Sequence, residues 1–320
     1  MISLKNSPIA EDIRFKPTTS TKNLGKLFAN FSDVFSNTVY ATAGENNNKL
    51  PEEKEWVLTS SDTDPPVLKL KIPRIVNKVY FQNDGKFPDP ASMHDNLKAA
   101  HKSWLSMNPG YEIRYFNLQL ARSYLRRFFH PVFLRAFDCI EPFASKADLF
   151  RLAIVYREGG WYSDWKEVCL KHGVLDNIAK ETIFFAARNN PNPCVNFQNA
   201  FFGSVPRHQI LARALEQIVM NVQSRNYGVK PWAPTGPCAF GRAITDVGYI
   251  ESKIGLFKGN DRYIWNDEVI VKHKCNECGK SQEWAKGNNY WTLWNEKQFY
   301  CEDAPLLFSD ERGWEEAALM

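Results

Sequence analysis

Two charged side chains in the stretch GGWYSDWKEV, residues 159–168, stand at a spacing that suits an anionic ligand. Asp164 and Lys166 are two residues apart, and the pattern predicts a strand, in which alternate side chains share a face. A carboxylate and an ammonium displayed together at a strand end could hold a phosphate-containing ligand. The alternative is a surface ion pair on an edge strand, which is common and contributes little to stability.

The segment before this strand, FASKADLFRLAIVYREGG, predicts a helix that is apolar nearly all round and therefore buried. Ser145 and Asp148 match an N-terminal capping pattern, and Gly159 and Gly160 are expected to end the helix. Asp148 and Arg151 are three residues apart and share one helix face. Buried charges need partners. The two therefore either pair with each other, or project into a cleft and bind sugar hydroxyls or a phosphate.

Strands and helices alternate along the chain from about residue 71, which predicts an α/β fold with a mainly parallel central sheet. In such open sheets, ligands bind outside the carboxyl ends of the strands, where Asp164 and Lys166 are expected. The expected strands are 75–81, 111–117, 161–170 and 182–188, and the expected helices are 91–106, 118–138, 143–158 and 209–222.

Residues 1–70 differ from the rest and predict an N-terminal extension, whereas residues 71–320 are expected to form the main domain. The extension contains polar, turn-rich stretches such as GENNNKLPEEKE and TSSDTDPP, which are typical of linkers. Apolar residues from Leu24 to Phe35 recur at three- and four-residue spacing and predict one amphipathic helix. Its polar face carries few lysines, which favours packing on the main domain over a membrane surface.

Composition narrows the class of protein. The chain has 320 residues, 44% apolar and 24% charged, so it can bury a sizeable core. A net charge of +4 suits a nucleotide ligand but is too weak to indicate nucleic-acid binding. Seven scattered cysteines argue against a disulfide framework and for a reducing compartment. Without a signal-like start or an apolar run long enough to span a membrane, we expect a soluble, cytoplasmic protein. Peripheral membrane association stays open.

A cysteine pair near the C-terminus raises the question of a metal. Cys275 and Cys278 have C-x-x-C spacing, with His273 just before them and Cys301 later. Four such ligands would suit a structural zinc. The lack of a second C-x-x-C pair favours unpaired or redox thiols instead. The following GNNYWTLW predicts either a mobile loop offering the indole N–H of Trp291 or Trp294 to a ligand, or an anchoring aromatic cluster.

The stretch SKADLFRLAIVYREGGWYSDWK resembles the motif of glycosyltransferase family 32, the glycosyltransferases with a DXD-type sugar-binding region, which include mannosyltransferases and capsular polysaccharide transferases. The family pattern is roughly a small residue, x-x-Asp-x-x-Arg, an apolar stretch, and Gly-Gly-x-Tyr-x-Asp-x-Asp. The likeness extends more weakly from residue 71 to about 305, through KIPRIVNKVYF, SWLSMNPGYEIRYFN, NAFFGSVPRHQIL and PTGPCAF. The matching positions are Ala144 or Ser145, Asp148, Arg151, Gly159, Gly160, Tyr162 and Asp164.

The resemblance implies a GT-A, Rossmann-like fold that binds a nucleotide sugar. The implied reaction moves a hexose from a UDP- or GDP-hexose to a hydroxyl of a glycan or polysaccharide acceptor, with retention at the anomeric carbon. Asp148 and Arg151 would contact the donor sugar, and Asp164 the ribose or a metal ion. His273 would complete the diphosphate site. Gly159, Gly160 and Tyr162 belong to the same donor-binding motif, and the acceptor side would include Asn199, Thr235 and Gly236.

The chain departs from the family at Lys166, where the second metal-binding Asp is expected. An ammonium removes a ligand and repels the Mn²⁺ or Mg²⁺ that would neutralise the leaving diphosphate. In one interpretation Lys166 binds the phosphates directly, so that Asp164 and Lys166 are the catalytic residues. In another, the protein is a catalytically degenerate sugar-nucleotide or glycan-binding protein. A third, in which Glu167 rescues metal binding, is disfavoured because strand alternation sends it to the opposite face.

Overall fold

The computed structural model describes residues 70–82, 95–189, 194–248, 252–258, 262–272 and 288–304. All of them belong to one of the two units into which the chain divides, Ser60–Arg312. The helix expected at 24–35 lies outside the described residues, and so do His273, Cys275 and Cys278.

The described residues contain one nine-stranded sheet. Its strands are β1 (Ile75–Val79), β2 (Glu112–Phe116), β3 (Gly160–Ser163), β4 (Val168–Cys169), β5 (Phe184–Arg188), β6 (Phe197–Ser204), β7 (Ser252–Lys258), β8 (Arg262–Trp265) and β9 (Glu268–Lys272). They are arranged in the order β2-β1-β3-β6-β5-β7-β8-β9-β4.

This sheet is mixed, so the expectation of a mainly parallel sheet is wrong. β1 pairs in parallel with β2 and β3, and β5 pairs in parallel with β7. The other five neighbouring pairs of the described sheet are antiparallel. Connection length explains the three antiparallel pairs of consecutive strands, β5–β6, β7–β8 and β8–β9, because a parallel neighbour needs a long crossover and these connections are too short for one.

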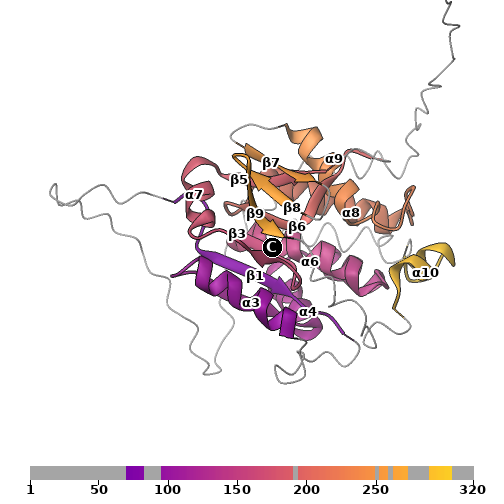
Figure 1. Cartoon of the computed structure of the whole chain (residues 1–320). Helices are drawn as coiled ribbons and strands as arrows, with labels where there is room; N and C mark the ends of the chain where they lie inside the picture. Colours follow the sequence, from indigo (N-terminus) through magenta and orange to yellow (C-terminus); the bar gives the residue numbers. More distant parts are fainter. Residues whose placement is uncertain are drawn as a thin grey trace, which may run out of the picture. The chain divides into compact units, whose positions relative to one another are not determined.

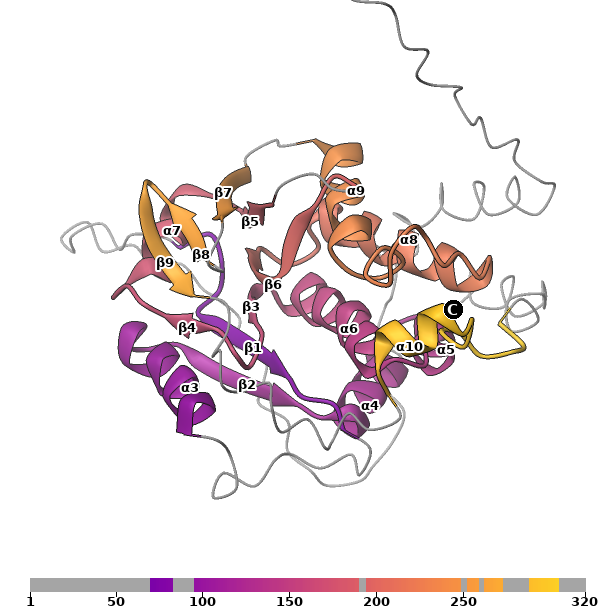
Figure 2. The same ribbon diagram turned by 45° about the vertical axis from the view of Figure 1, so that its right-hand side comes forward.

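Helices cover both faces of the sheet, which confirms the expected α/β class. Figure 1 and Figure 2 show α6, α8 and α9 together on one side of the strands and α3 and α7 on the other. The helices are α3 (Asp95–Met107), α4 (Leu118–Phe128), α5 (Pro131–Cys139), α6 (Phe143–Glu158), α7 (Val174–Glu181), α8 (Gln209–Gln223), α9 (Pro237–Val247) and α10 (Tyr290–Asn295).

The helix expected over 118–138 is two helices, α4 and α5. Pro131 cannot continue the first of them, because it has no N–H and restricts the residue before it. His130 instead caps α5, and its Nδ1 accepts a hydrogen bond from the Val132 N–H at 3.3 Å. Pro131 therefore marks the boundary between α4 and α5, which the apolar pattern over 118–138 does not show.

Helix α6 is buried along most of its length, as its sequence predicted. Its start differs from the expected one, because Pro142 is the N-cap, and Ser145 and Asp148 lie inside the helix. The first N–H of the helix, that of Phe143, donates to the side chain of Asn288 at 2.6 Å. Its end is confirmed at Gly159, whose φ is 69°. Gly160 follows with φ 88°, and a Cβ on it would lie 2.7 Å from the Ile75 carbonyl oxygen. Both backbone conformation and space therefore require glycine where α6 turns into β3.

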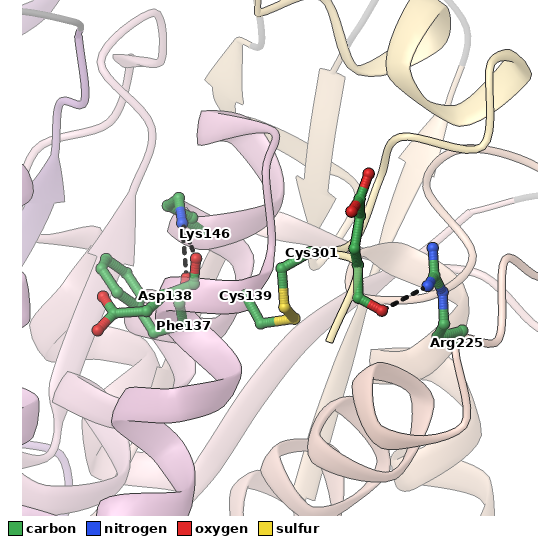
Figure 3. The surroundings of a disulfide bond; sticks show 7 residues. Phe137, Asp138, Cys139, Lys146, Arg225 and Cys301 are labelled. Atoms are coloured by element: carbon green, nitrogen blue, oxygen red, sulfur yellow. Dashed lines mark hydrogen bonds between the residues drawn. A yellow bond between two sulfur atoms is a disulfide. The ribbon is translucent and has the colours of Figure 1, made fainter. Parts of the chain in front are cut away.

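Four of the five cysteines in the described ranges form disulfides, so the expectation that the chain has no disulfide framework is wrong. Cys139 joins Cys301 across 162 residues, and Cys194 joins Cys238 across 44. Figure 3 shows the first bond between α5 and the C-terminal segment. The partners are far apart in sequence, so their spacing carried no signal of the pairing. Cys301 is thereby also lost as a fourth zinc ligand.

Candidate functional site

A turn carries the charged residues of the opening motif. β3 ends at Ser163, and the Glu167 N–H donates to the Asp164 carbonyl at 3.2 Å, which closes a turn over Trp165 and Lys166. The continuous strand expected over 161–170 is therefore wrong. Asp164 and Lys166 are the first and third residues of this turn, and strand alternation does not place them on a common face.

Arg151 links two carboxylates from different elements. Its guanidinium lies 3.3 Å from Asp148, one turn earlier in α6, and 3.3 Å from Asp164 on the turn after β3. It also donates to the Asn199 carbonyl at 2.9 Å. The Arg151 side chain is 7% exposed and that of Asp148 13%, whereas Asp164 is 31% exposed. Asp164 is therefore the most exposed member of the cluster, and its two charged neighbours are buried.

Two neighbours hold the Asp148 carboxylate in place. The Asn199 side-chain amide from β6 donates to Oδ1 at 2.8 Å, and the Thr235 hydroxyl donates to Oδ2 at 2.9 Å. Gly236 follows at the N-cap of α9, and a Cβ there would lie 3.1 Å from Asp148 Oδ2. The residues expected on the acceptor side therefore lie against the residue expected to contact the donor sugar, in one cluster.

Tyr162 orients Asp164 from β3. Its hydroxyl donates to Asp164 Oδ1 at 2.5 Å, and the Arg151 guanidinium lies 4.5 Å from its ring centre. Burial raises the pKa of the Tyr162 hydroxyl well above its ordinary value. The phenol therefore stays protonated at neutral pH and remains a hydrogen-bond donor to the carboxylate.

Burial and charge act in opposite directions on the two charged groups of α6. Burial raises the pKa of Asp148, and the charge of Arg151 and the hydrogen bond from Thr235 oppose the rise. Burial alone would lower the pKa of Arg151, but the nearby carboxylates of Asp164 and Asp148 outweigh it and the pKa is raised. Arg151 is therefore a fixed positive charge between two acidic groups.

Lys166 and Glu167 have different surroundings on the same turn. Lys166 is half-buried and has no hydrogen-bond or ion-pair partner within the described part of the chain. Glu167 is fully buried, and its Oε1 accepts a hydrogen bond from the Tyr263 hydroxyl of β8 at 2.8 Å. Its environment thus differs from that of Asp164, as expected, although a turn and not strand alternation separates them.

The described residues do not make a metal site of the expected kind. Among the described residues, no three His, Cys, Asp or Glu side chains are grouped so that they could hold an ion. The Asp164 carboxylate already accepts from Tyr162 and faces Arg151, and an ammonium follows two residues later. The Lys166 ammonium, which has no partner within the described ranges, suits an anionic ligand rather than a metal ion.

The aromatic stretch before the C-terminus has one anchor and one exposed residue. The Trp294 indole donates to the Tyr227 carbonyl at 2.6 Å, so it fixes α10 rather than offering its N–H to a ligand. Trp291 is 41% exposed and packs edge-on against Trp232, with ring centres 5.4 Å apart. The Trp232 carbonyl in turn accepts a hydrogen bond from the Gly236 N–H at 3.2 Å. Trp232 therefore connects Trp291 to the segment that contacts Asp148.

Sequence reasoning missed one buried charge near this site. Lys78 in β1 is 1% exposed and donates to the backbone of the turn that carries Asp164. A signal was present in the sequence, because a lysine in the middle of the otherwise buried strand IVNKV requires a partner in the interior.

Comparison with known proteins finds relatives of one kind. The model of the family described as "Glycosyltransferase sugar-binding region containing DXD motif" matches residues 94–185. An uncharacterised glycosyltransferase of Acanthamoeba polyphaga mimivirus is 30% identical over 216 residues, which cover 65% of this chain and 80% of that protein.

Two yeast proteins are more distant. Inositol phosphoceramide mannosyltransferase 2 of Schizosaccharomyces pombe is 24% identical over 177 residues, 52% of this chain. Mannosyl phosphorylinositol ceramide synthase SUR1 of Saccharomyces cerevisiae is 24% identical over 155 residues, 48% of this chain. The matches span only 47% and 37% of the length of these two proteins.

Two solved structures are similar at low identity. The PaToxG glycosyltransferase is 16% identical, with a TM-score of 0.41, and the match covers 55% of this chain and 69% of that one. The ligand-free glycosyltransferase domain of the YGT toxin is 10% identical, with a TM-score of 0.40, and the match covers 78% of this chain and 90% of that one.

Proposed function

The chain belongs to the glycosyltransferases with a DXD-type sugar-binding region, and we propose that it moves a hexose from a nucleotide-diphosphate sugar to a hydroxyl of a glycan or polysaccharide. Its α/β sheet with helices on both faces agrees with the GT-A fold expected of that family. The observation that carries the proposal is the buried Asp148–Arg151–Asp164 cluster, whose one half-exposed member faces solvent.

In this proposal Asp148 and Arg151 bind the donor sugar, and Asp164 binds the sugar or the ribose. Charged groups held rigidly by buried neighbours recognise hydroxyls at little entropic cost. Tyr162 keeps the Asp164 carboxylate in one orientation, and Asn199 does the same for Asp148. Thr235 donates a hydrogen bond to Asp148, and Gly236 lies against the same carboxylate. We propose that the acceptor enters on this side of the cluster, beside Trp291.

We propose that Lys166 binds the diphosphate directly. The leaving group carries its negative charge at the moment the glycosidic bond breaks, and a positive group at that position stabilises it. Lys166 has an ammonium with no partner among the described residues, on the same turn as Asp164. The site therefore supplies a positive charge where the family pattern has a carboxylate for a metal.

Calorimetric binding of UDP- and GDP-hexoses, in EDTA and in Mn²⁺, tests this proposal. Wild type should bind one of them in EDTA, and Lys166→Asp should lose that binding by about tenfold or more unless Mn²⁺ is added. Lys102→Asp, an exposed lysine of α3, is the matched control and should bind as wild type does. Binding that requires Mn²⁺ in wild type would refute the role of Lys166.

Turnover separates the enzyme from a degenerate binding protein. The proposed enzyme should hydrolyse its nucleotide sugar slowly in the absence of acceptor, whereas a degenerate protein would bind it unchanged. The anomeric configuration of the first product, read by NMR, tests retention, because inversion of the sugar would contradict it.

The two disulfides bear on where the protein works. The prediction of a reducing compartment depended on scattered cysteines that argued against a disulfide framework, and the two disulfides contradict that argument. Disulfides persist in oxidising compartments and are rare in the cytosol. We therefore infer maturation in an oxidising compartment. No helix of the described residues is long and apolar enough to cross a membrane.

A further inference from the structure

Lys78 is buried in an inner strand of the sheet, where a charge is costly. β1 has β2 on one side and β3 on the other, and the Lys78 side chain is 1% exposed. Several kcal/mol are lost, on the order of the effective penalty for a buried ion, unless the charge is well paired and hydrogen-bonded. Its partners should therefore explain why a lysine stands there.

The three acceptors of the ammonium belong to Ser163, the last residue of β3, and to Asp164, the first residue of the turn. Lys78 Nζ lies 3.1 Å from Ser163 Oγ, 3.2 Å from the Asp164 carbonyl and 3.5 Å from the Ser163 carbonyl. The Asp164 carbonyl is the same oxygen that accepts from the Glu167 N–H. One ammonium thus holds the backbone oxygen on which the turn closes.

The last residue of the turn, Glu167, is held by Trp104, which lies next to Lys78. The Lys78 ammonium lies 5.0 Å from the centre of the Trp104 ring, and the Trp104 indole donates to the Glu167 carbonyl at 2.7 Å. The turn is therefore supported from beneath at both ends, by Lys78 from β1 and by Trp104 from α3, while Lys166 between them has no partner in the described part of the chain.

We propose that Lys78 is a positioning residue of the donor site, whose ammonium holds the Asp164–Glu167 turn so that Asp164 meets Arg151 and Lys166 meets the diphosphate. The proposal rests on the proposed function of that site. Lys78 acts through the turn, because its ammonium is buried beneath it and touches backbone and Ser163 rather than solvent.

The ammonium also balances negative charge under the turn. Burial lowers the pKa of Lys78 to about 8, and the charges of Glu167 and Asp164 oppose the decrease. On α3, His101 also faces Lys78, and its pKa is lowered by burial and by the lysine charge. Lys78 is therefore charged at neutral pH and loses its proton as the pH rises through about 8.

This titration changes activity and stability in opposite directions. Loss of the charge weakens the support of the turn, so activity should fall above pH 8. The folded pKa lies below that of an unfolded lysine, so the unfolded chain binds more protons between about pH 8 and 10, and this group makes the fold more stable there as the pH rises. A fall in activity without a fall in stability therefore separates positioning from unfolding.

Lys146 provides a matched control. It is also a buried lysine whose pKa burial lowers to about 8, and it donates to the Phe137 and Asp138 carbonyls at 2.7 and 3.0 Å. Figure 3 shows it bound to the end of α5, beside the Cys139–Cys301 bond. It has the same chemistry as Lys78 but makes no contact with the Asp164 turn.

The experiment measures kcat/KM for nucleotide-sugar hydrolysis from pH 6 to 9.5, with melting temperature, for wild type, Lys78→Gln, Lys78→Met and Lys146→Gln. At pH 7 both Lys78 variants should fall about 10- to 100-fold, the scale of a small displacement at an active site. The ratio of wild type to Lys78→Gln should shrink above pH 8. Lys146→Gln should keep the wild-type profile.

Hydrogen exchange of the apo proteins gives a second measurement that needs no ligand. The Glu167 and Asp164 amides, bonded to the Asp164 and Ala200 carbonyls, should exchange faster in Lys78→Gln and remain protected in Lys146→Gln. Unchanged exchange, or equal pH profiles in wild type and Lys78→Gln, would overturn the proposal. Faster exchange in a protein that binds no nucleotide sugar would instead support the positioning of the turn and refute the proposed function.

Discussion

The Arg151 guanidinium lies 3.3 Å from the carboxylate of Asp164, although one residue belongs to a buried helix and the other to a turn at the end of a central strand. The same guanidinium is 3.3 Å from Asp148. One cation thus joins helix α6 to the turn that follows β3.

Arg151→Met should destabilise the fold strongly. It would leave Asp148 buried without its cation, which costs about 3–5 kcal/mol for a buried pair, measured as the free energy of unfolding in urea. Arg122→Met is the control, because the Arg122–Asp138 pair is 45% and 38% exposed and is worth at most about 1 kcal/mol. Equal losses in the two variants would contradict a buried network.

Thr235→Val should raise KM for the donor. It removes the hydroxyl that holds Asp148 Oδ2, and a lost bond to a buried carboxylate costs about 1.5–3 kcal/mol, or roughly 10- to 100-fold in affinity if all of it is felt in binding. The same change at Thr245, whose hydroxyl donates to the Gly241 carbonyl of its own helix, should leave KM unchanged. Steady-state kinetics measure both variants.

Gly160→Ala should be far more damaging than Gly173→Ala. Both glycines have positive φ, 88° and 66°, so both variants suffer backbone strain of about 1–2 kcal/mol. Only at Gly160 does the added Cβ also meet an atom, the Ile75 carbonyl oxygen at 2.7 Å, which would separate β3 from β1. Thermal melts compare the two, and similar melting temperatures would refute the close approach.

A non-reduced digest should contain the peptide of Cys139 joined to that of Cys301, identified by mass spectrometry. Reduction, or Cys301→Ser, should lower stability by about 2–5 kcal/mol, the typical loss for a native disulfide. Cys169→Ser, at a buried free thiol, leaves both bonds intact, so reduction should lower its stability as much as that of wild type. Free thiols at Cys139 in native protein would contradict the bond.

The sequence by itself determined the local part of this protein. Six matching positions between Asp148 and Asp164 lie within seventeen residues of one helix, one glycine turn and one strand, so their spacing alone predicted the family and most of the charged cluster. The buried character of α6 and its end at Gly159 followed from apolar pattern and glycine chemistry, which act over a few residues.

Only the tertiary structure decided the contacts between distant segments. Asn199 and Thr235 reach Asp148 from 51 and 87 residues away, Lys78 reaches Asp164 across 86, and Cys139 reaches Cys301 across 162. Local pattern also gave one strand over 161–170, where the backbone bends into a turn that Lys78 and Trp104 support from other elements. Such partners depend on how the sheet orders its strands, and residue spacing along the chain contains no record of that order.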